Sequence, residues 1–127
     1  MKIQNQLGYI KGITFAPFHR RGSLSTQTAR DSFDYMIEHT AADFVILAPV
    51  GLQDHAHSEE ICYTSSATFS DEELINMIRY AKSKGIKLSM WTLCSTLDKQ
   101  LDSALDQFNK WGVDFIMTDF MDRDDQP

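Results

Sequence analysis

The sequence has 127 residues, of which 43% are hydrophobic, so we expect one globular domain with enough apolar material for a core. Its formal net charge of −6 argues against a nucleic-acid partner, because phosphate binding needs a basic surface. The sequence contains no apolar run of the roughly 18–20 residues that a membrane-spanning helix requires, so we expect no membrane partner either.

The N-terminal segment and the cysteines indicate a compartment. Residues 1–12, MKIQNQLGYIKG, lack the continuous apolar region of a signal peptide. Cys62 and Cys94 form neither a CxxC pair nor a zinc-binding spacing. We therefore expect two free, buried thiols in a reducing compartment, which implies a cytoplasmic location.

Strand and helix patterns alternate from the first residues onward. A segment rich in β-branched and aromatic residues predicts a strand at residues 9–16. Apolar residues at helical spacing predict a helix over residues 27–40, with Ser25 or Thr26 as its N-cap. A continuous apolar run at residues 42–50 then predicts a strand that is covered on both faces.

The clearest predicted element is a helix over residues 70–85. Ser70 and Glu73 have the spacing of a capping box, and Gly85 supplies the stop signal. The apolar stripe of this helix comprises Leu74, Ile75, Ile78 and Ala81. A third strand is predicted directly after it, at residues 86–93.

The rest of the chain predicts a third helix at residues 96–112 and a fourth strand at residues 113–120. One face of this helix carries Leu97, Leu101, Leu105 and Phe108. The order βαβαβαβ predicts an α/β fold with a parallel sheet and right-handed crossovers. Units of roughly 30 residues match half of a TIM (βα)8 barrel of ~250 residues. We therefore predict a single (βα)4-type half-barrel domain over residues 1–127 that lacks the fourth helix and is completed by dimerisation.

The longest stretch without periodicity is the loop at residues 48–69. Connections between a strand and its helix usually take about 2–6 residues, and much longer ones are often functional. The loop follows the C-terminal end of a strand, where barrel enzymes keep their active sites. We predict that His19, Asp54 and Trp91 bind substrate at this edge, beside Asp119, although Trp91 could instead belong to the core.

Residues 11–90 carry a resemblance to a known enzyme family. The matching segments are KGITF, RGSLS, ADFVIL and SDEELINMIRYAKSKGIKL. They resemble the N-terminal half of the mannanase-like glycoside hydrolases of family 113. The resemblance implies a (βα)8 barrel that cleaves β-mannan with two glutamates. Those glutamates are expected after the fourth and seventh strands and have no counterpart in this sequence.

Residues 100–126, QLDSALDQFNKWGVDFIMTDFMDRDDQ, resemble a second family, the catalytic barrel of the family 97 glycoside hydrolases. This resemblance implies that Asp119 is the vestigial counterpart of a catalytic nucleophile. A retaining glycosidase needs a second carboxyl group about 5–5.5 Å away to protonate the leaving oxygen. The resemblance implies that this partner comes from a strand beyond the fourth. Two resemblances in succession suggest a recombined or engineered chimera.

Two other patterns contain residue types that bind metal ions. His55 and His57 point the same way on an extended segment and could bind zinc, but a zinc site needs three or four ligands. The segment DRDDQ at residues 122–126 lacks the turn glycine and the distant glutamate of a calcium loop. We therefore predict a solvated histidine pair, no metal site and no cofactor.

Three hypotheses about function follow. The first is a glycoside-hydrolase-derived half-barrel that self-assembles into a full barrel, as a homodimer or higher oligomer, with little or no catalytic activity. The second is a weak retaining glycosidase whose site is shared across a dimer, with Asp119 and a rim acid such as Asp54 or Glu59. The third is a metal-dependent hydrolase that uses His55 and His57. A carbohydrate is the expected ligand of the first two.

Overall fold

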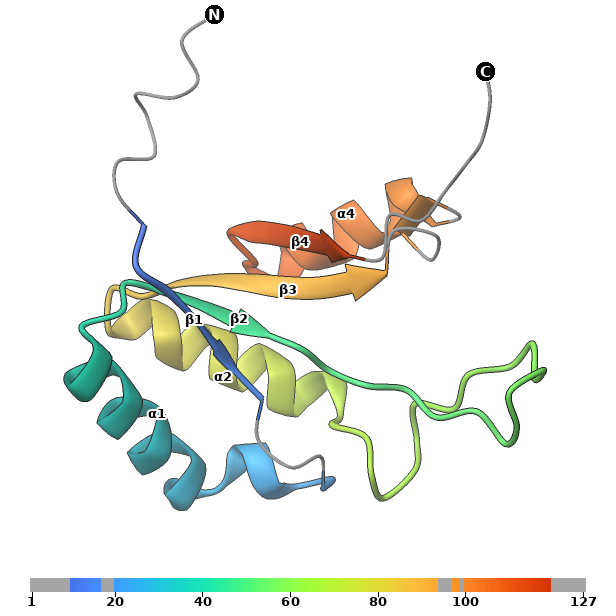
Figure 1. Ribbon diagram of the computed structural model, residues 1–127, viewed down its shortest axis with the longest axis horizontal. Coiled ribbons are helices and arrows are strands. Elements are labelled where there is room, and N and C mark those ends of the chain that lie inside the picture. Colours follow the sequence, from blue (N-terminus) through green and yellow to red (C-terminus); the bar gives the residue numbers. More distant parts are fainter. Residues whose placement is uncertain (1–9, 17–19, 94–96, 99, 120–127) are drawn as a thin grey trace, which may run out of the picture.

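A computed structural model describes residues 10–16, 20–93, 97–98 and 100–119 (Figure 1). The strands are β1 (Gly12–Phe15), β2 (Phe44–Leu47), β3 (Lys87–Leu93) and β4 (Phe115–Asp119). The helices are the short 3-10 helix η2 (Ser23–Ser25) and the α-helices α1 (Gln27–Thr40), α2 (Asp71–Ser83) and α4 (Leu101–Trp111). None of the described helices is long and apolar enough to cross a membrane.

The four strands form one parallel sheet in the order β1-β2-β3-β4. Along one row of this sheet Ile13 pairs with Val45, and Val45 pairs with Leu88. The sequential order is that of a (βα)8 barrel, whereas a doubly wound sheet has a rearranged order. The structure therefore confirms the predicted parallel half of a TIM barrel.

The two faces of the sheet differ in what covers them. Right-handed crossovers between sequential strands place all the helices on the same face. On that face Val45 and Leu88 pack with Phe33 and Ile78 in the core. The opposite face corresponds to the interior of a barrel. It carries Phe44, Ile46, Ser89, Trp91, Phe115 and Met117.

Local hydrogen bonds at the helix starts agree with the sequence. The Ser70 side chain accepts from the Glu73 N–H at 3.2 Å, and Glu73 Oε2 accepts from the Ser70 N–H at 2.8 Å. This is the predicted capping box, which typically contributes ~1 kcal/mol. Thr26 caps α1 by accepting from the Ala29 N–H, and Gly85 has a positive φ of 74° after α2. These features need only residues close in sequence, so the sequence predicts them well.

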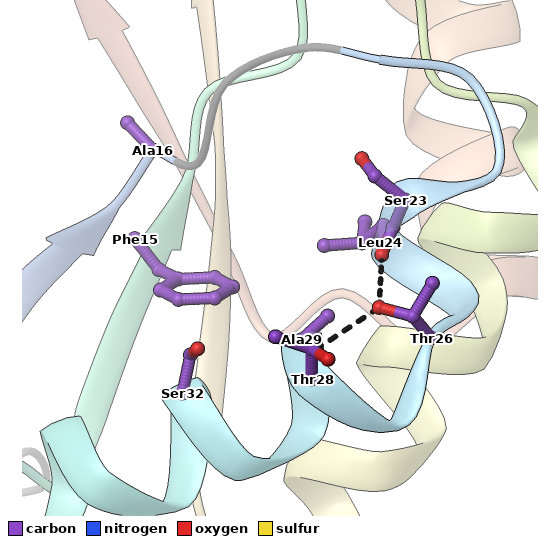
Figure 2. Close-up of a pocket in the computed structure, with 8 residues that line it drawn as sticks. All are labelled: Phe15, Ala16, Ser23, Leu24, Thr26, Thr28, Ala29 and Ser32. Atoms are coloured by element: carbon purple, nitrogen blue, oxygen red, sulfur yellow. Dashed lines mark hydrogen bonds between the residues drawn. The ribbon is translucent and has the colours of Figure 1, made fainter.

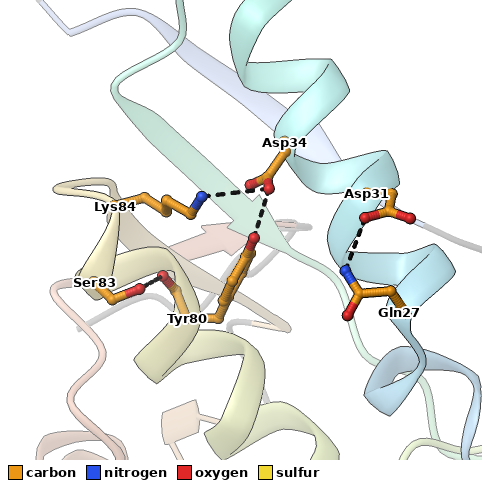
Figure 3. A network of polar contacts seen from close by, with 6 residues as sticks. All are labelled: Gln27, Asp31, Asp34, Tyr80, Ser83 and Lys84. Atoms are coloured by element: carbon orange, nitrogen blue, oxygen red, sulfur yellow. Dashed lines mark hydrogen bonds and ion pairs between the residues drawn. The ribbon is translucent and has the colours of Figure 1, made fainter.

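A polar contact joins α1 to α2 on the outer surface (Figure 3). Asp34 on α1 accepts from the Tyr80 hydroxyl at 2.6 Å and from Lys84 Nζ at 3.4 Å. The hydrogen bond to Asp34 raises the pKa of Tyr80. The Lys84 ammonium and the Arg30 guanidinium also lie over the Tyr80 ring. The contact holds the two helices side by side.

Several predicted boundaries and faces are wrong in detail. The first, second and fourth strands begin later than predicted, at Gly12, Phe44 and Phe115, and β2 also ends earlier, at Leu47, where the chain leaves the sheet for the long loop. On α2, Met77 is buried and Ile75 is only half-buried, since the stripe facing the sheet passes through Leu74, Met77, Ile78 and Ala81.

The apolar face predicted for the third helix is largely uncovered. Leu101 and Leu105 on α4 are 46% and 44% exposed. Only the C-terminal part of α4 reaches the core, through Phe108 and Trp111. The periodicity identified the apolar stripe but not how far the neighbouring elements extend along it.

Candidate functional site

Two of the predicted site residues meet on the barrel-facing side of the sheet. Trp91 on β3 donates its Nε1–H to Oδ2 of Asp119, at the end of β4, at 3.3 Å. In the strand register Trp91 pairs with Met117, so Asp119 lies two residues farther along the same face. Trp91 is half-buried and Asp119 is exposed. The indole therefore orients a carboxylate at the C-terminal edge of the sheet, where barrel enzymes act.

An oriented carboxylate could serve as a nucleophile or stabilise a positive charge on a sugar ring. Hydrolysis with retention also needs the acid partner about 5–5.5 Å away. Asp54 and Glu59, the predicted rim acids, are exposed on the loop that extends away from the sheet (Figure 1). They are not part of the Trp91–Asp119 contact. The predicted site is thus brought together only in part.

Several predicted residues lie outside the part of the chain that the structure describes. These are His19, Cys94 and the segment at residues 122–126. Cys62 is described, and it is free but exposed, so the prediction of a buried thiol is wrong for this residue. A hydrogen bond with Thr64 lowers the pKa of the Cys62 thiol.

The histidine pair shows no sign of a metal centre. His55 and His57 are both exposed in the long loop. Among the described residues, no three or more histidine, cysteine or carboxylate side chains gather in a way that could hold a metal ion. No observation therefore favours the metal-dependent hydrolase.

The long loop contains an antiparallel contact that the sequence analysis did not predict. Leu52 and Cys62 exchange two backbone hydrogen bonds, of 2.9 and 2.6 Å. The side chain of Gln53 donates to the carbonyl of Ser58 at 2.7 Å and closes the turn. The loop therefore folds back on itself as a hairpin that projects beyond the sheet (Figure 1).

Arg21 fastens the base of this hairpin to the loop that follows β1. Its backbone N–H donates to the carbonyl of Ser66 at 2.8 Å. Its guanidinium donates to the carbonyls of Tyr63 at 3.0 Å and Thr68 at 3.3 Å. Arginine can make several such bonds at once because it has five N–H donors. Arg21 thus holds two rim loops together.

The sequence analysis also did not identify Gly51 and Tyr63 in the hairpin. A Cβ atom at Gly51 would clash with the Ile61 side chain and would lie only 2.7 Å from the Tyr63 ring. Two short runs, VGL at residues 50–52 and ICY at residues 61–63, were the available signal. A glycine within an extended run often marks a close approach of this kind.

A shallow hollow of about 430 Å³ lies beside β1 on the helix-bearing side (Figure 2). It is lined by Phe15, Ala16, Ser23, Leu24, Thr26, Thr28, Ala29 and Ser32. The Thr26 hydroxyl already donates to the carbonyl of Ser23 at 2.7 Å and accepts from the Ala29 N–H at 3.1 Å. The lining holds no ionisable side chain, so the hollow is suited to packing and not to acid–base chemistry.

Solved structures resemble this fold. A complex of a GH113 β-1,4-mannanase shares 41% identity with a TM-score of 0.63, covering 67% of this chain and 28% of its own. A second GH113 β-1,4-mannanase structure shares 43% identity with a TM-score of 0.61, covering 65% and 26%. The GH113 β-mannanase AaManA from Alicyclobacillus acidocaldarius, in complex with ManMIm, shares 33% identity with a TM-score of 0.60, covering 67% and 27%. This chain thus spans little more than a quarter of their length.

No curated protein matches the sequence. Among family models, that of Glycoside Hydrolase Family 113 matches residues 13–114. The match extends into the segment that resembles family 97, as far as residue 114; that second resemblance and a chimeric origin stay predictions. The sheet has the strand order of a barrel and the family model covers most of the sequence, so the chain belongs to Glycoside Hydrolase Family 113.

Proposed function

We propose that this chain is a Family 113 half-barrel that pairs with a second copy to close a full barrel, and that it has little or no catalytic activity. The observation that carries the proposal is the sheet itself, in which β1 and β4 are the two edges. Edge strands of a parallel sheet readily pair with another chain. Pairing β4 of each copy with β1 of the other gives eight strands around a two-fold axis.

The backbone direction at both edges supports this pairing. The carbonyl of Lys11 accepts from the Phe44 N–H of β2, so the backbone groups of Lys11 face β2. Successive residues of a strand direct their backbone groups to opposite sides, and the N–H of Thr14, three residues on, therefore faces away from β2. At the other edge the Asp114 N–H donates to Leu88 on β3. By the same alternation Phe115 directs its backbone groups away from β3. Each edge thus offers backbone donors and acceptors to a parallel strand.

The barrel-facing side chains also support closure. Phe44 and Phe115 contact each other across this face, with ring centres 5.3 Å apart. Ser89, which pairs with Phe115 in the register, has a buried hydroxyl with no hydrogen-bond partner among the described residues. A barrel interior is a packed core of such side chains. A second half would cover Met117, which is exposed on this face.

The proposed ligand is a carbohydrate of the type on which the similar mannanases act. The structural neighbours are described as β-1,4-mannanases, and Trp91 presents a ring and a carboxylate partner at the C-terminal edge of the sheet, where barrel enzymes keep their sites. We expect weak binding without efficient cleavage, because one carboxylate does not complete the acid and nucleophile pair. The Trp91–Asp119 contact favours one alternative function, a weak retaining glycosidase with a site shared across the dimer.

Hydrolysis assays separate these two candidates. We expect little or no turnover of 4-nitrophenyl β-mannoside or soluble β-mannan by the parent protein. The Asp119→Asn variant should keep the fold and the assembly, because Asp119 is exposed. Robust turnover that disappears in Asp119→Asn would overturn the proposal in favour of the shared site. Turnover that a chelator abolishes would instead revive the metal-dependent hydrolase.

A further inference from the structure

We propose that the hollow beside β1 receives the ring of Phe120 from a second copy of this chain, and that this contact sets the register in which the two halves of the barrel join. The assignment rests on the proposed function, because the second copy is the partner that closes the barrel. It adds an occupant for the hollow and a pairing register for the new strand pair (Figure 2). Phe120 directly follows Asp119, the last residue that the structure describes.

The geometry of an eight-stranded barrel restricts the register at the new strand pair. A TIM barrel has a shear of about 8 residues over its full circuit, so each of two identical halves contributes a shift of about 4 residues. Within one copy, Thr14 on β1 shares a row with Phe115 on β4. The shift therefore pairs Phe115 of one copy either with Ile10 or with position 18 of the other.

Only one of these two directions sets strand against strand. If Phe115 meets Ile10, β4 lies along β1, and the pair that follows β4 joins Phe120 to Phe15. The opposite shift would set β1 beside residues 109–112, which belong to α4 and the turn after it. Strand pairing therefore selects the first direction and places Phe120 opposite Phe15.

The alternation of side chains directs this pair to the helix-bearing side of the sheet. Phe115 contacts Phe44 on the barrel-facing side. Successive side chains of a strand point to opposite faces, so even-numbered positions that continue β4 face the helices. Phe15 lies on the helix-bearing side, where its ring meets Phe33 edge-on with ring centres 5.6 Å apart. Phe120 and Phe15 thus share one face of the joined sheet.

The hollow lies where the ring of Phe120 would arrive. It is situated between the C-terminal end of β1 and helix α1, and the ring of Phe15 forms one of its walls (Figure 2). Leu24 and Ala29 supply further apolar walls, and none of the described residues that line it is charged. A cavity of about 150 Å³ already holds a benzene ring. This hollow measures about 430 Å³, so it has the volume and the lining for a phenylalanine side chain.

Photo-crosslinking identifies the occupant of the hollow directly. With p-benzoylphenylalanine at position 120, we expect crosslinks to residues 24–32 of the other copy, which a mixture of unlabelled and isotope-labelled chains distinguishes from crosslinks within one chain. The same probe at position 121 is the matched control. It should not reach residues 24–32, because neighbouring positions of a strand face opposite sides. Crosslinks from position 120 that stay within one chain, or that avoid this segment, would overturn the inference.

The affinity of the dimer provides a second readout. Light scattering over a dilution series should show that Phe120→Ala raises the dissociation constant by about a hundredfold, which is about tenfold for each of two equivalent contacts. Ser32→Phe should weaken the dimer as well, because a ring from α1 would occupy the hollow within the same copy. Glu38→Phe adds a ring at another exposed position of α1 and should assemble as the parent does.

The outcomes separate this contact from the proposed function. A dimeric parent whose affinity is unchanged in Phe120→Ala would overturn the occupant of the hollow and leave the closed barrel standing. Ser32→Phe keeps Phe120 in place, so parent-like affinity in this variant, with the far-ultraviolet circular dichroism of the parent, would overturn the occupant too. A parent that stays a folded monomer would overturn both the contact and the proposed function.

Discussion

Glu73 links two loops of the rim through one buried carboxylate. Its Oε1 accepts from the Leu24 N–H at 3.1 Å, and its Oε2 accepts from the Ser70 N–H. Burial raises the pKa of Glu73, but hydrogen bonds from the backbone of Ser70, Gly22 and Leu24 together outweigh it, so the pKa lies below its usual value. We expect Glu73→Gln to lower the free energy of unfolding by about 1–3 kcal/mol at pH 7, because an amide cannot accept both bonds.

The direction in which stability changes with pH tests the same prediction about Glu73. A carboxylate whose pKa is lowered on folding stabilises the protein above its unfolded pKa, and that stabilisation is lost as pH falls through the folded value. The gap in urea-unfolding free energy between the parent and Glu73→Gln should therefore be widest near neutral pH and shrink in acid. A gap that stays constant from pH 7 to pH 3 would show that the Glu73 charge does not contribute.

At the residue scale, the sequence predicted the contacts that span three or four residues and missed those that span more. The Ser70–Glu73 capping box and the Thr26 cap follow from local spacing. The hydrogen bonds from Arg21 to Tyr63 and Thr68 join residues more than 40 positions apart in the sequence, and no local pattern predicts them. For the same reason Trp91 was predicted to stack on a sugar or sit in the core, not to orient Asp119.

At the scale of elements, β1 carries the most direct test of edge pairing. Thr14→Pro removes the N–H that Thr14 directs away from β2 and costs no bond within the sheet. We expect this variant to keep the far-ultraviolet circular dichroism of the parent but to lose the assembly. Thr14→Val keeps both the N–H and the branched shape, so it should assemble normally. A folded Thr14→Pro protein that assembles as the parent does would show that β1 is not at the interface.

Helix α4 shows why periodicity predicts an element better than its burial. Its apolar stripe was identified correctly, yet Leu101 and Leu105 remain exposed because the core reaches only the Phe108 end. Hydrophobic spacing reports which residues share a face, whereas burial depends on the neighbours that face meets. β2 was predicted as covered on both faces and is buried at all four positions, because it lies inside the sheet.

At the scale of the whole molecule, alternation of strands and helices was enough to predict a sequential parallel sheet. The right-handed crossovers and the length of each strand–helix unit allow few other strand orders. The described sheet has the predicted order. The site was less predictable because its parts come from separate loops, and some of them lie outside the described residues. Fold therefore follows from repeated local patterns, while the site depends on contacts between distant segments.

The central claim is that two copies close one barrel, and the solution mass tests it most directly. Light scattering coupled to size exclusion, at concentrations from low to high micromolar, should give a particle of twice the 14.5 kDa chain mass. Its fraction should fall on dilution as a reversible dimer requires. A well-folded particle of 14.5 kDa throughout that range would contradict the account, because both sheet edges would then be stable without a partner.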